Sequence, residues 1–389
     1  MTARDPHTAV PPRTEPPAKT APGRADGVDA TPAGVRPYGA GESFEFALAA
    51  PLEAHEPPEA RGLRRDEVRL LVSRRDTGEV TGEVTGEVTG EVTHHVFADL
   101  PSLLSPGDLL VVNNSATLPA AVRLDRLAVH FSGRLASGEW LVELRRRTAT
   151  ATEPYSGVAP GEWLPLPGGA TLRLPAQETP RLWRAHLDRD VLSYLAVHGV
   201  PIRYGHVRRD WPLADYQTVF GVEPGSAEMP SAGRPFTPEL VTDLVRRGIG
   251  IAPITLHTGV ASPEKDEPPY PEWFSVSPWT ARLVNITREH GGRVIAVGTT
   301  VVRALETAAL DAPAPGTVRA TSGWTSHVVT PAEGVRAVDG LVTGLHEPRS
   351  SHLMMLSSIT GTGVLARAYE AALEEGYLWH EFGDSHLIL

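Results

Sequence analysis

The sequence predicts an α/β domain that is interrupted by a small inserted β-barrel. From residue 238 onward, expected helices alternate with apolar strands, and this order favours a sheet with helices packed on its faces. Between residues 122 and 185, short alternating runs are broken by glycine and proline, which is typical of a small barrel. The 389 residues are 41% hydrophobic, which is enough for a sizeable core.

The N-terminal part begins with a segment of low complexity. Residues 1–42 are rich in proline, alanine, glycine and threonine without a hydrophobic period, so we expect a disordered arm. Four tandem copies of Thr-Gly-Glu-Val occupy residues 77–92, and we interpret them as an insertion at the tip of a hairpin. The predicted division is an arm at 1–42, an α/β domain at 43–121 and 196–389, and the inserted barrel at 122–195.

The elements of the α/β domain follow from local periodicity. An apolar strand at Leu109–Val112 leads into Asn113. Helical and strand periods then alternate in the C-terminal half of the chain. The expected elements there are a helix at Glu239–Val245, a strand at Gly250–Leu256, a helix at Ser277–Glu289, a strand at Arg293–Val297, helices at Val301–Ala309 and Val364–Glu375, and a docked C-terminal strand.

Composition excludes several kinds of site. Without cysteine, the chain has no disulfide, no cysteine-ligated zinc, no iron–sulfur cluster and no thiol nucleophile. It has neither a membrane-length apolar run nor a secretory signal, so we expect a cytoplasmic protein that does not contact a membrane. The arm is neutral, and the net charge of −11 therefore falls on the rest of the chain, which lowers the expectation of a large RNA footprint.

The clearest local pattern is a buried strand followed by Gly298, Thr299, Thr300 and a helix. The two hydroxyls can cap that helix, and its free amides form an anion site. Arg303 follows one turn later and could face a ligand carboxylate. The alternative, which spacing alone favours, is an ordinary capped turn with a surface pair between Arg303 and Glu306.

His257 follows the strand at 250–256, where ligands bind in α/β sheets, and is placed for proton transfer. The alternative is a structural histidine bonded to loop backbone. His346 and His352 resemble a metal pair, but their spacing spans a proline and lacks helical ligand geometry, so we expect no metal. Ser350 or its neighbour could cap the helix that follows. Asp384 is either a placed acid or a turn residue.

Together these stretches resemble the S-adenosylmethionine:tRNA ribosyltransferase-isomerase family from about Phe44 to Leu389. The segments that carry the resemblance are Pro106–Asn113, Tyr216–Phe220, Pro224–Ser226, Thr255–His257, Val297–Thr300, Ser322–Thr325, Asp339–Ser350 and Phe382–Asp384. The resemblance implies an α/β catalytic domain with an inserted β-barrel. It also implies that S-adenosylmethionine, as a substrate, gives its ribosyl group to 7-aminomethyl-7-deazaguanine in tRNA. Adenine and methionine leave, and the sugar becomes an epoxy-cyclopentanediol.

The matched positions give the site residues that the resemblance implies. The catalytic candidates are His257, Glu272, His346 and Asp384. The substrate-binding candidates are Asn113, Gly259, Gly298, Thr299, Thr300, Arg303, Glu306, Thr343, Pro348 and Ser350, with the turn from Gly298 to Arg303 assigned to the methionine carboxylate.

Departures from the family pattern bear on the acceptor. Ala116 and Ala121 stand where the family has arginines, and Pro235 stands where it has a histidine. Because a lost arginine cannot hold a phosphate, the first alternative is a related enzyme, a transferase or lyase, that acts on a small molecule. The second alternative is a non-catalytic nucleoside-binding protein. S-adenosylmethionine is the expected partner, tRNA is an open one, and we expect a monomer or weak oligomer.

Overall fold

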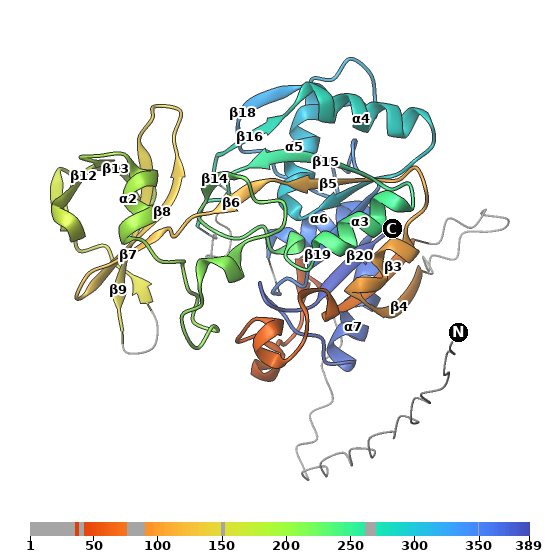
Figure 1. The fold of residues 1–389 in the computed structure, drawn as a ribbon, viewed down its shortest axis with the longest axis horizontal. Coiled ribbons are helices and arrows are strands. Elements are labelled where there is room, and N and C mark those ends of the chain that lie inside the picture. The colour runs from red at the N-terminus through yellow and green to blue at the C-terminus, as the bar shows by residue number, and fades with distance from the viewer. Residues whose placement is uncertain (1–35, 39–42, 76–89, 149–151, 261–269, 349) are drawn as a thin grey trace, which may run out of the picture. The chain divides into compact units, whose positions relative to one another are not determined.

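The structure, a computed structural model, describes residues 36–38, 43–75, 90–148, 152–260, 270–348 and 350–389 (Figure 1). The expected arm therefore lies outside the described residues, apart from strand β1 at Arg36–Tyr38, which pairs with β2 at Ser43–Glu45. Most of the Thr-Gly-Glu-Val repeat lies outside them too, and its last residues belong to strand β4 (Gly90–Val96). No helix in the described ranges combines the length and the apolar character that a bilayer crossing needs.

A nine-stranded mixed sheet forms the main part of the fold. Its four central strands, β15 (Gly250–Leu256), β5 (Leu109–Asn113), β17 (Val294–Val297) and β19 (Gly340–Gly344), are parallel to one another. The C-terminal strand β20 docks between β19 and β3, which confirms the expected docked terminus. In spatial order the strands are β18 (Thr321–Thr325), β16 (Glu272–Val276), β15 (Gly250–Leu256), β5 (Leu109–Asn113), β17 (Val294–Val297), β19 (Gly340–Gly344), β20 (Ser385–Ile388), β3 (Arg69–Arg75) and β4 (Gly90–Val96).

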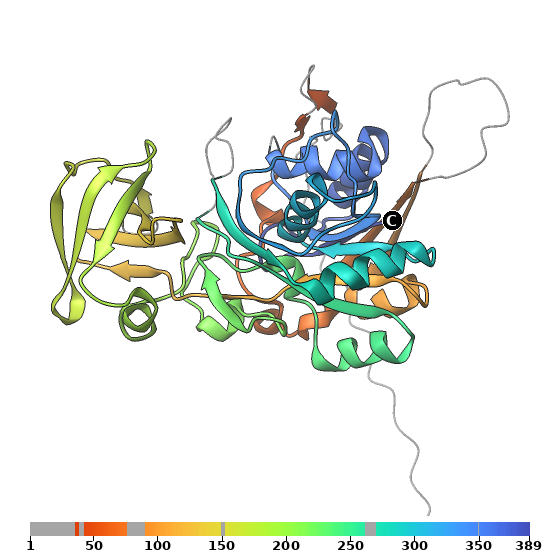
Figure 2. The same cartoon turned by 90° about the horizontal axis from the view of Figure 1, so that it is seen from above.

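Helices cover both faces of this sheet, so the expected α/β class is confirmed. Leu110 and Val112 point to the core under helices α1 (Leu100–Leu103) and α3 (Pro238–Arg246), while Leu109 and Val111 point to the core on the opposite face. Because both faces are buried, the central strands read as unbroken apolar runs. Figure 2 shows the blue C-terminal helices and the green helix α3 on opposite sides of the sheet. The helices are α1 (Leu100–Leu103), α3 (Pro238–Arg246), α4 (Pro278–Glu289), α5 (Thr299–Leu310), α6 (Ser351–Thr360) and α7 (Thr362–Glu374).

The order of the central strands creates a switch point. Along the chain they occur as β5, β15, β17 and β19, but in space β15 and β17 flank β5. The chain therefore moves to one side of β5 and then to the other. In open α/β sheets, ligands bind outside the carboxyl ends of the strands at such a reversal. Here that place lies between Asn113, which ends β5, and Thr300, which follows β17.

A second, antiparallel sheet occupies the region where the barrel was expected. It has its own core, which includes Phe131, Leu172 and Trp183. The strands, in spatial order, are β11 (Glu162–Leu166), β12 (Ala170–Gln177), β13 (Leu182–Leu187), β9 (Trp140–Arg147), β8 (Leu127–Arg134) and β7 (Ala121–Arg123), and β10 (Thr152–Pro154) pairs with β9. In the described residues β11 and β7 stand at opposite ends of this order. The structure thus gives a curled sheet, and both its closure into a barrel and the predicted domain division stay predictions.

Short elements join the two sheets. Helix α2 (Val191–His198) follows the second sheet, and Val200 then pairs with Ala121 where the chain enters that sheet. Strands β6 (Ser115–Thr117) and β14 (Glu223–Ser226) run parallel to each other just beyond the end of β5. They bring two serines next to the switch point.

Candidate active site

Two adjoining cavities lie near the carboxyl ends of the central strands. The larger, of about 470 Å³, is lined by residues of the second sheet on one side and, on the other, by residues of β14, β16 and β18 and of the connection between β15 and β16. The smaller, of about 70 Å³, is lined by the first turns of α5 and α6. Glu272 lines both cavities, so its carboxylate stands where they meet.

Asn113 holds the switch point together. Its side-chain amide donates to Leu256 O at 2.8 Å and to Thr300 Oγ1 at 3.3 Å. Its Oδ1 accepts from the backbone of Leu256 at 3.0 Å and of Ser115 at 3.1 Å. Because the side chain is buried and these four bonds use both donors and both acceptor sites, Asn113 positions the residues around it.

His257 lines the larger cavity and is held by a side chain. Its Nδ1 lies 2.8 Å from Ser115 Oγ, and its ring stacks on Trp273 at 5.2 Å between centroids. A Cβ on Gly225 would lie 2.4 Å from the ring, so that position has room only for glycine. Burial lowers the pKa of His257 to about 4, and the imidazole is therefore neutral at pH 7.

A chain of hydroxyls continues behind His257. Ser115 Oγ lies 2.6 Å from Ser226 Oγ, and the backbone N–H of Thr258 donates to Ser226 Oγ at 3.1 Å. Both serines are buried. The chain therefore runs through the protein interior from the loop after β15 to Nδ1 of His257.

Arg303 does face a carboxylate, but that carboxylate belongs to the protein. Its Nη1 donates to Glu272 Oε2 at 2.5 Å, and the other Glu272 oxygen accepts from Gly259 N at 2.8 Å. Burial raises the pKa of Glu272, and the nearby Arg303 and the Gly259 amide oppose this rise. The expected surface pair with Glu306 is wrong, because Arg303 is only 7% exposed and Glu306 is fully buried.

Most of the Arg303 guanidinium is already satisfied. Its remaining bonds go to three carbonyls, those of Tyr270 at 3.0 Å, Thr325 at 2.9 Å and His327 at 3.1 Å. With the bond to Glu272, four of its five N–H groups have partners. One Nη1 N–H is left to point at a ligand in the smaller cavity, which Arg303 lines.

The expected threonine cap on helix α5 is wrong. Gly298 is the N-cap residue, with φ of 98°, and it carries no side-chain cap. Thr299 and Thr300 are the first helical residues, and both line the smaller cavity. Both threonines therefore line the cavity instead of capping the helix, and Thr300 Oγ1 also accepts from the Asn113 amide.

Glu306 lines neither cavity, and its carboxylate binds backbone amides instead. Its carboxylate accepts from the amides of Arg336 at 2.8 Å and Ala337 at 2.9 Å. These bonds fix the segment that leads into β19. A substrate contact at Glu306 stays a prediction, although its two oxygens already have partners.

His346 lies behind the smaller cavity. Its Nε2 is 2.8 Å from Thr343 Oγ1, and its ring stacks on His352 at 4.5 Å. His352 lines the smaller cavity and was not among the expected site residues. Burial, with His352 and His386 nearby, keeps the pKa of His346 well below its usual range. Among the described residues, no set of three or more His, Asp or Glu side chains is arranged to hold a metal.

The loop before α6 contains the last two binding candidates. Ser350 is the N-cap residue of α6, yet its hydroxyl makes no capping bond and is buried without a partner among the described residues. Pro348 lies in the preceding turn. Neither residue lines the two cavities, so their predicted contact with substrate stays untested by this geometry.

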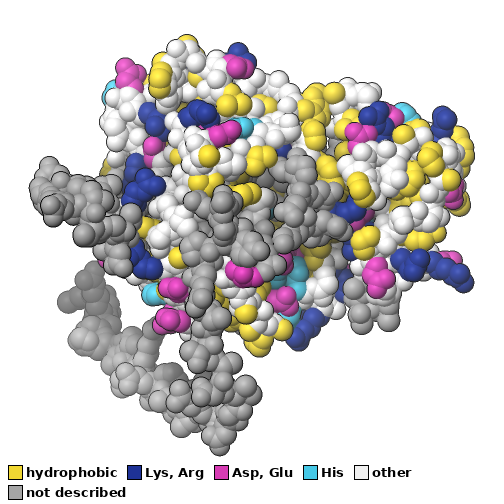
Figure 3. All heavy atoms as spheres, turned by 180° about the vertical axis from the view of Figure 1, so that it is seen from behind, with side chains coloured by type: hydrophobic (Ala, Val, Ile, Leu, Met, Phe, Trp, Pro, Cys, Tyr) yellow, Lys and Arg dark blue, Asp and Glu magenta, His cyan; other side chains and the backbone are white. Residues whose placement is uncertain are grey.

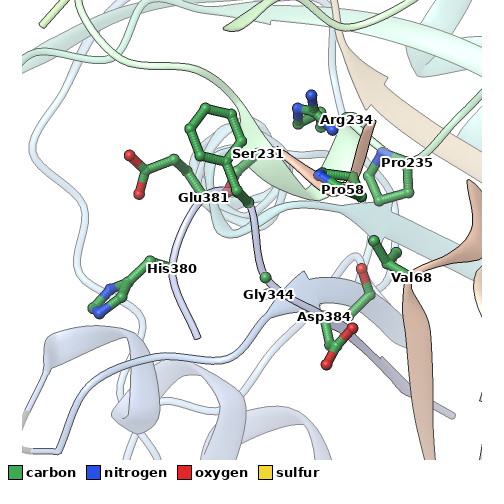
Figure 4. Close-up of a pocket in the computed structure, with 12 residues that line it drawn as sticks. Pro58, Val68, Ser231, Arg234, Pro235, Gly344, His380, Glu381 and Asp384 are labelled. Atoms are coloured by element: carbon green, nitrogen blue, oxygen red, sulfur yellow. The ribbon is translucent and has the colours of Figure 1, made fainter. Parts of the chain in front are cut away.

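Asp384 lies apart from the other catalytic candidates. One of its oxygens accepts from Arg69 N and the other from Leu378 N, both at 2.8 Å. It lines a separate cavity of only about 10 Å³, where Asp384 and His380 lie on opposite sides of Gly344 (Figure 4). Burial raises the pKa of Asp384. This geometry ties β3 to the loop before β20, and the predicted acid role stays a prediction.

Aromatic residues of the larger cavity were missed by sequence reasoning. Trp140 comes from the second sheet, whereas Tyr270, Trp273 and Trp324 come from the main part of the fold. Trp324 Nε1 donates to Arg134 O at 3.0 Å and so links the two parts. These residues come from distant parts of the chain, and no local spacing indicates that they share one cavity.

Comparison with known proteins gives consistent matches over nearly the whole described chain. Residues 41–388 match the family model described as queuosine biosynthesis protein. The S-adenosylmethionine:tRNA ribosyltransferase-isomerase of Moorella thermoacetica is 35% identical over 373 residues, covering 90% of this chain and 99% of that protein. The enzyme of the same name from Heliobacterium modesticaldum is 34% identical, covering 89% and 98%. A crystal structure of S-adenosylmethionine tRNA ribosyltransferase from Thermotoga maritima is 27% identical, with a TM-score of 0.49, and covers 88% and 99%.

Proposed function

The chain belongs to the family of queuosine biosynthesis proteins, and from this premise we propose how its residues carry out the family's reaction. It is an S-adenosylmethionine:tRNA ribosyltransferase-isomerase, an enzyme that moves the ribosyl group of S-adenosylmethionine to tRNA and rearranges the sugar. The acceptor is the aminomethyl group of 7-aminomethyl-7-deazaguanine. The relatives favour neither the small-molecule acceptor nor the non-catalytic alternative.

One observation carries the assignment of roles, namely that two cavities share the carboxylate of Glu272. The smaller cavity offers the start of α5, two threonine hydroxyls and the remaining N–H of Arg303, a set that suits the methionine carboxylate. The larger cavity is big enough for purine-sized groups and is lined by aromatic rings that can stack on them. The sugar between methionine and adenine would then lie beside Glu272.

Glu272 is proposed as the base. The C5′ proton of S-adenosylmethionine is acidified by the adjacent sulfonium, and a carboxylate at the junction of the cavities can remove it. Desolvation raises the basicity of Glu272, while Arg303 and the Gly259 amide hold its two oxygens in place. Arg303 is in this respect a positioning residue.

His257 is proposed as a hydrogen-bond donor rather than as a base, because of its tautomer. Thr258 N–H already donates to Ser226 Oγ, so the Ser226 hydroxyl must donate elsewhere. Its one acceptor among the described residues is Ser115 Oγ, and the Ser115 hydroxyl then donates to Nδ1 of His257. Assigned from this network, the ring proton sits on Nε2. A neutral imidazole with Nε2–H in the larger cavity can stabilise the charge that develops on departing adenine.

The test is release of adenine and methionine from S-adenosylmethionine, measured by chromatography with and without tRNA that carries the aminomethyl base. Release should depend on that tRNA. Glu272→Gln and His257→Ala should each lower the rate by about 100-fold or more, whereas His290→Ala, an exposed histidine away from both cavities, should not. Near-normal release by either cavity variant would remove that residue from the proposed chemistry.

A further inference from the structure

The net charge of −11 is distributed unevenly along the chain. Residues 121–211, which include the second sheet and the segment after α2, contain 13 arginines against 9 acidic side chains, a net charge of +4. The remainder of the chain has 23 basic and 38 acidic side chains, a net charge of −15. The acidic total therefore conceals a basic region, and the low expectation of RNA contact drawn from the total does not apply to it.

Seven of these arginines form one surface, which we call the arginine patch. They come from β7 and the turn after it, from the end of β9, and from the segment after α2. The members are Arg123, Arg126, Arg146, Arg147, Arg203, Arg208 and Arg209. Figure 3 shows dark-blue side chains gathered at the lower edge of the part that carries the second sheet.

Hydrogen bonds and ion pairs join the three segments of the patch. Arg123 makes a two-pronged pair with Asp210 at 2.6 and 2.7 Å, and Arg203 Nε lies 3.3 Å from the same carboxylate. Arg147 N donates to Arg126 O at 2.9 Å. Five of the seven arginines are exposed, and the acidic residues beside them are Asp125 and Asp210 in the same segments and Glu153 in β10, which pairs with Arg146. The patch thus keeps an excess of four positive charges.

Two of the arginines lie over aromatic rings. The guanidinium of Arg209 is 3.9 Å from the centre of the Trp211 ring, and that of Arg146 is 5.4 Å from the centre of the Tyr155 ring. A planar guanidinium held over a ring keeps its N–H edge free for phosphate oxygens and can itself stack on a base. Single-stranded and looped RNA is bound by this combination of arginine and aromatic side chains.

Strands β8 and β9 connect the arginine patch to the larger cavity. The turn before β8 and the end of β9 carry patch residues, whereas Ser132 and Trp140 at their other ends line the cavity. An extended chain spans about 20 Å from Arg126 to Ser132. A ligand that fills the cavity and also touches the patch must therefore be much longer than one nucleotide. Seven like charges repel one another, so an anionic partner would stabilise this surface.

We propose that the arginine patch binds the phosphate backbone of tRNA while the modified base occupies the larger cavity. This inference rests on the proposed function for the identity of the RNA. The patch contributes affinity and not chemistry, because it lies a full strand length from the cavity. Removing the charges of the patch should weaken the binding of tRNA without changing the binding of S-adenosylmethionine.

The test compares two triple variants of the full chain. Arg126→Gln, Arg146→Gln and Arg209→Gln remove three patch charges, and Arg246→Gln, Arg282→Gln and Arg319→Gln remove three exposed charges elsewhere. Binding of fluorescently labelled tRNA is followed by anisotropy over a range of potassium chloride concentrations. Circular dichroism and thermal melting establish that both variants are folded. Adenine release at saturating tRNA gives kcat separately from KM.

The patch variant should bind tRNA about 10-fold more weakly or worse, and the slope of log K against log salt should fall by about 2 to 3. Its kcat should be unchanged while KM for tRNA rises, and the control variant should match the unaltered protein. An unchanged affinity and salt slope in the patch variant would overturn the inference even if adenine release depends on tRNA. If the unaltered protein releases no adenine, the proposed function fails, while the binding slopes still decide whether the patch holds RNA.

Discussion

Replacing Arg303 by methionine tests whether the ion pair between Arg303 and Glu272 stabilises the fold and positions the carboxylate that both cavities share. Methionine keeps a long apolar side chain but removes the guanidinium. The variant therefore lacks the hydrogen bond to Glu272 and the three hydrogen bonds to backbone carbonyls that the guanidinium makes. The Glu272 carboxylate stays behind with only the Gly259 amide as a partner.

The expected cost follows from burial. The side chains of Arg303 and Glu272 are 8% and 18% exposed, so water screens the pair only weakly. Removing one partner of a buried ion pair costs about 3–5 kcal/mol. The free energy of unfolding at pH 7 should fall by that amount. The double variant Arg303→Met with Glu272→Gln should recover part of it, because a neutral amide needs no cation.

The pH dependence has a definite sign. Burial raises the pKa of Glu272 above its ordinary value near 4.5, and loss of Arg303 raises it further. The folded variant then keeps a proton that the unfolded chain has released. The stability that this bound proton contributes is fully present below the ordinary pKa of Glu272. It is lost as the pH rises through the pKa in the folded state, by up to about 1.4 kcal/mol per pH unit.

Urea unfolding between pH 5 and pH 8 of the unaltered protein, the two single variants and the double variant measures these effects. The Arg303→Met variant should lose more stability relative to the unaltered protein at pH 8 than at pH 5, and the double variant should show no such slope. A loss below about 1 kcal/mol at pH 7, with no pH slope, would refute the reasoning. It would mean that the pair is solvated and does not position Glu272.

Four further predictions concern His257, Glu306 and Asp384, two of them for His257. In 15N spectra, the His257 ring should carry its proton on Nε2, and Ser226→Ala should shift the population toward Nδ1–H; an Nδ1 proton in the unaltered protein would contradict the hydroxyl chain. Because the pKa of His257 is about 4, adenine release should lose no activity to its protonation until pH falls toward 4, which a pH–rate profile shows. Glu306→Gln should lower the free energy of unfolding by about 1–3 kcal/mol, with kcat per folded molecule retained, since Glu306 accepts two buried amides. Asp384→Asn should likewise lower the melting temperature while kcat per folded molecule is retained. A large loss of kcat in a stably folded variant would place Asp384 in the chemistry.

Local patterns located the elements of the α/β domain well. The strand expected at Gly250–Leu256 has those bounds in the structure, and the helix expected at Val301–Ala309 extends by a few residues to Thr299–Leu310. Apolar periodicity and turn residues are properties of neighbouring positions, so they are visible in the sequence. The cap of α5 was misjudged because Thr299 can cap in principle, whereas the backbone at Gly298 takes a conformation that favours glycine.

Contacts between side chains from distant segments were harder to predict from the sequence. Of the four catalytic candidates, His257 and Glu272 line the larger cavity, whereas Asp384 lines a separate one and His346 contacts His352, which lines the smaller cavity. Arg303 was expected to face a ligand carboxylate or to pair with Glu306, whereas the carboxylate that it contacts is that of Glu272 in β16. A residue's neighbours across a sheet depend on strand order, which local spacing does not encode.

By itself, the sequence determined the α/β class, the positions of the buried strands, the Gly-Thr-Thr turn and the family, because each depends on residue order and local periodicity. Only the tertiary structure decided that the chain reverses around β5, that Glu272 stands where two cavities meet, and that arginines from three segments gather on one surface. These features depend on distances through space between segments far apart in the chain. Hydrogen bonds, ion pairs and hydrophobic contacts act over a few ångströms, so their pairing is settled only when the sheets pack.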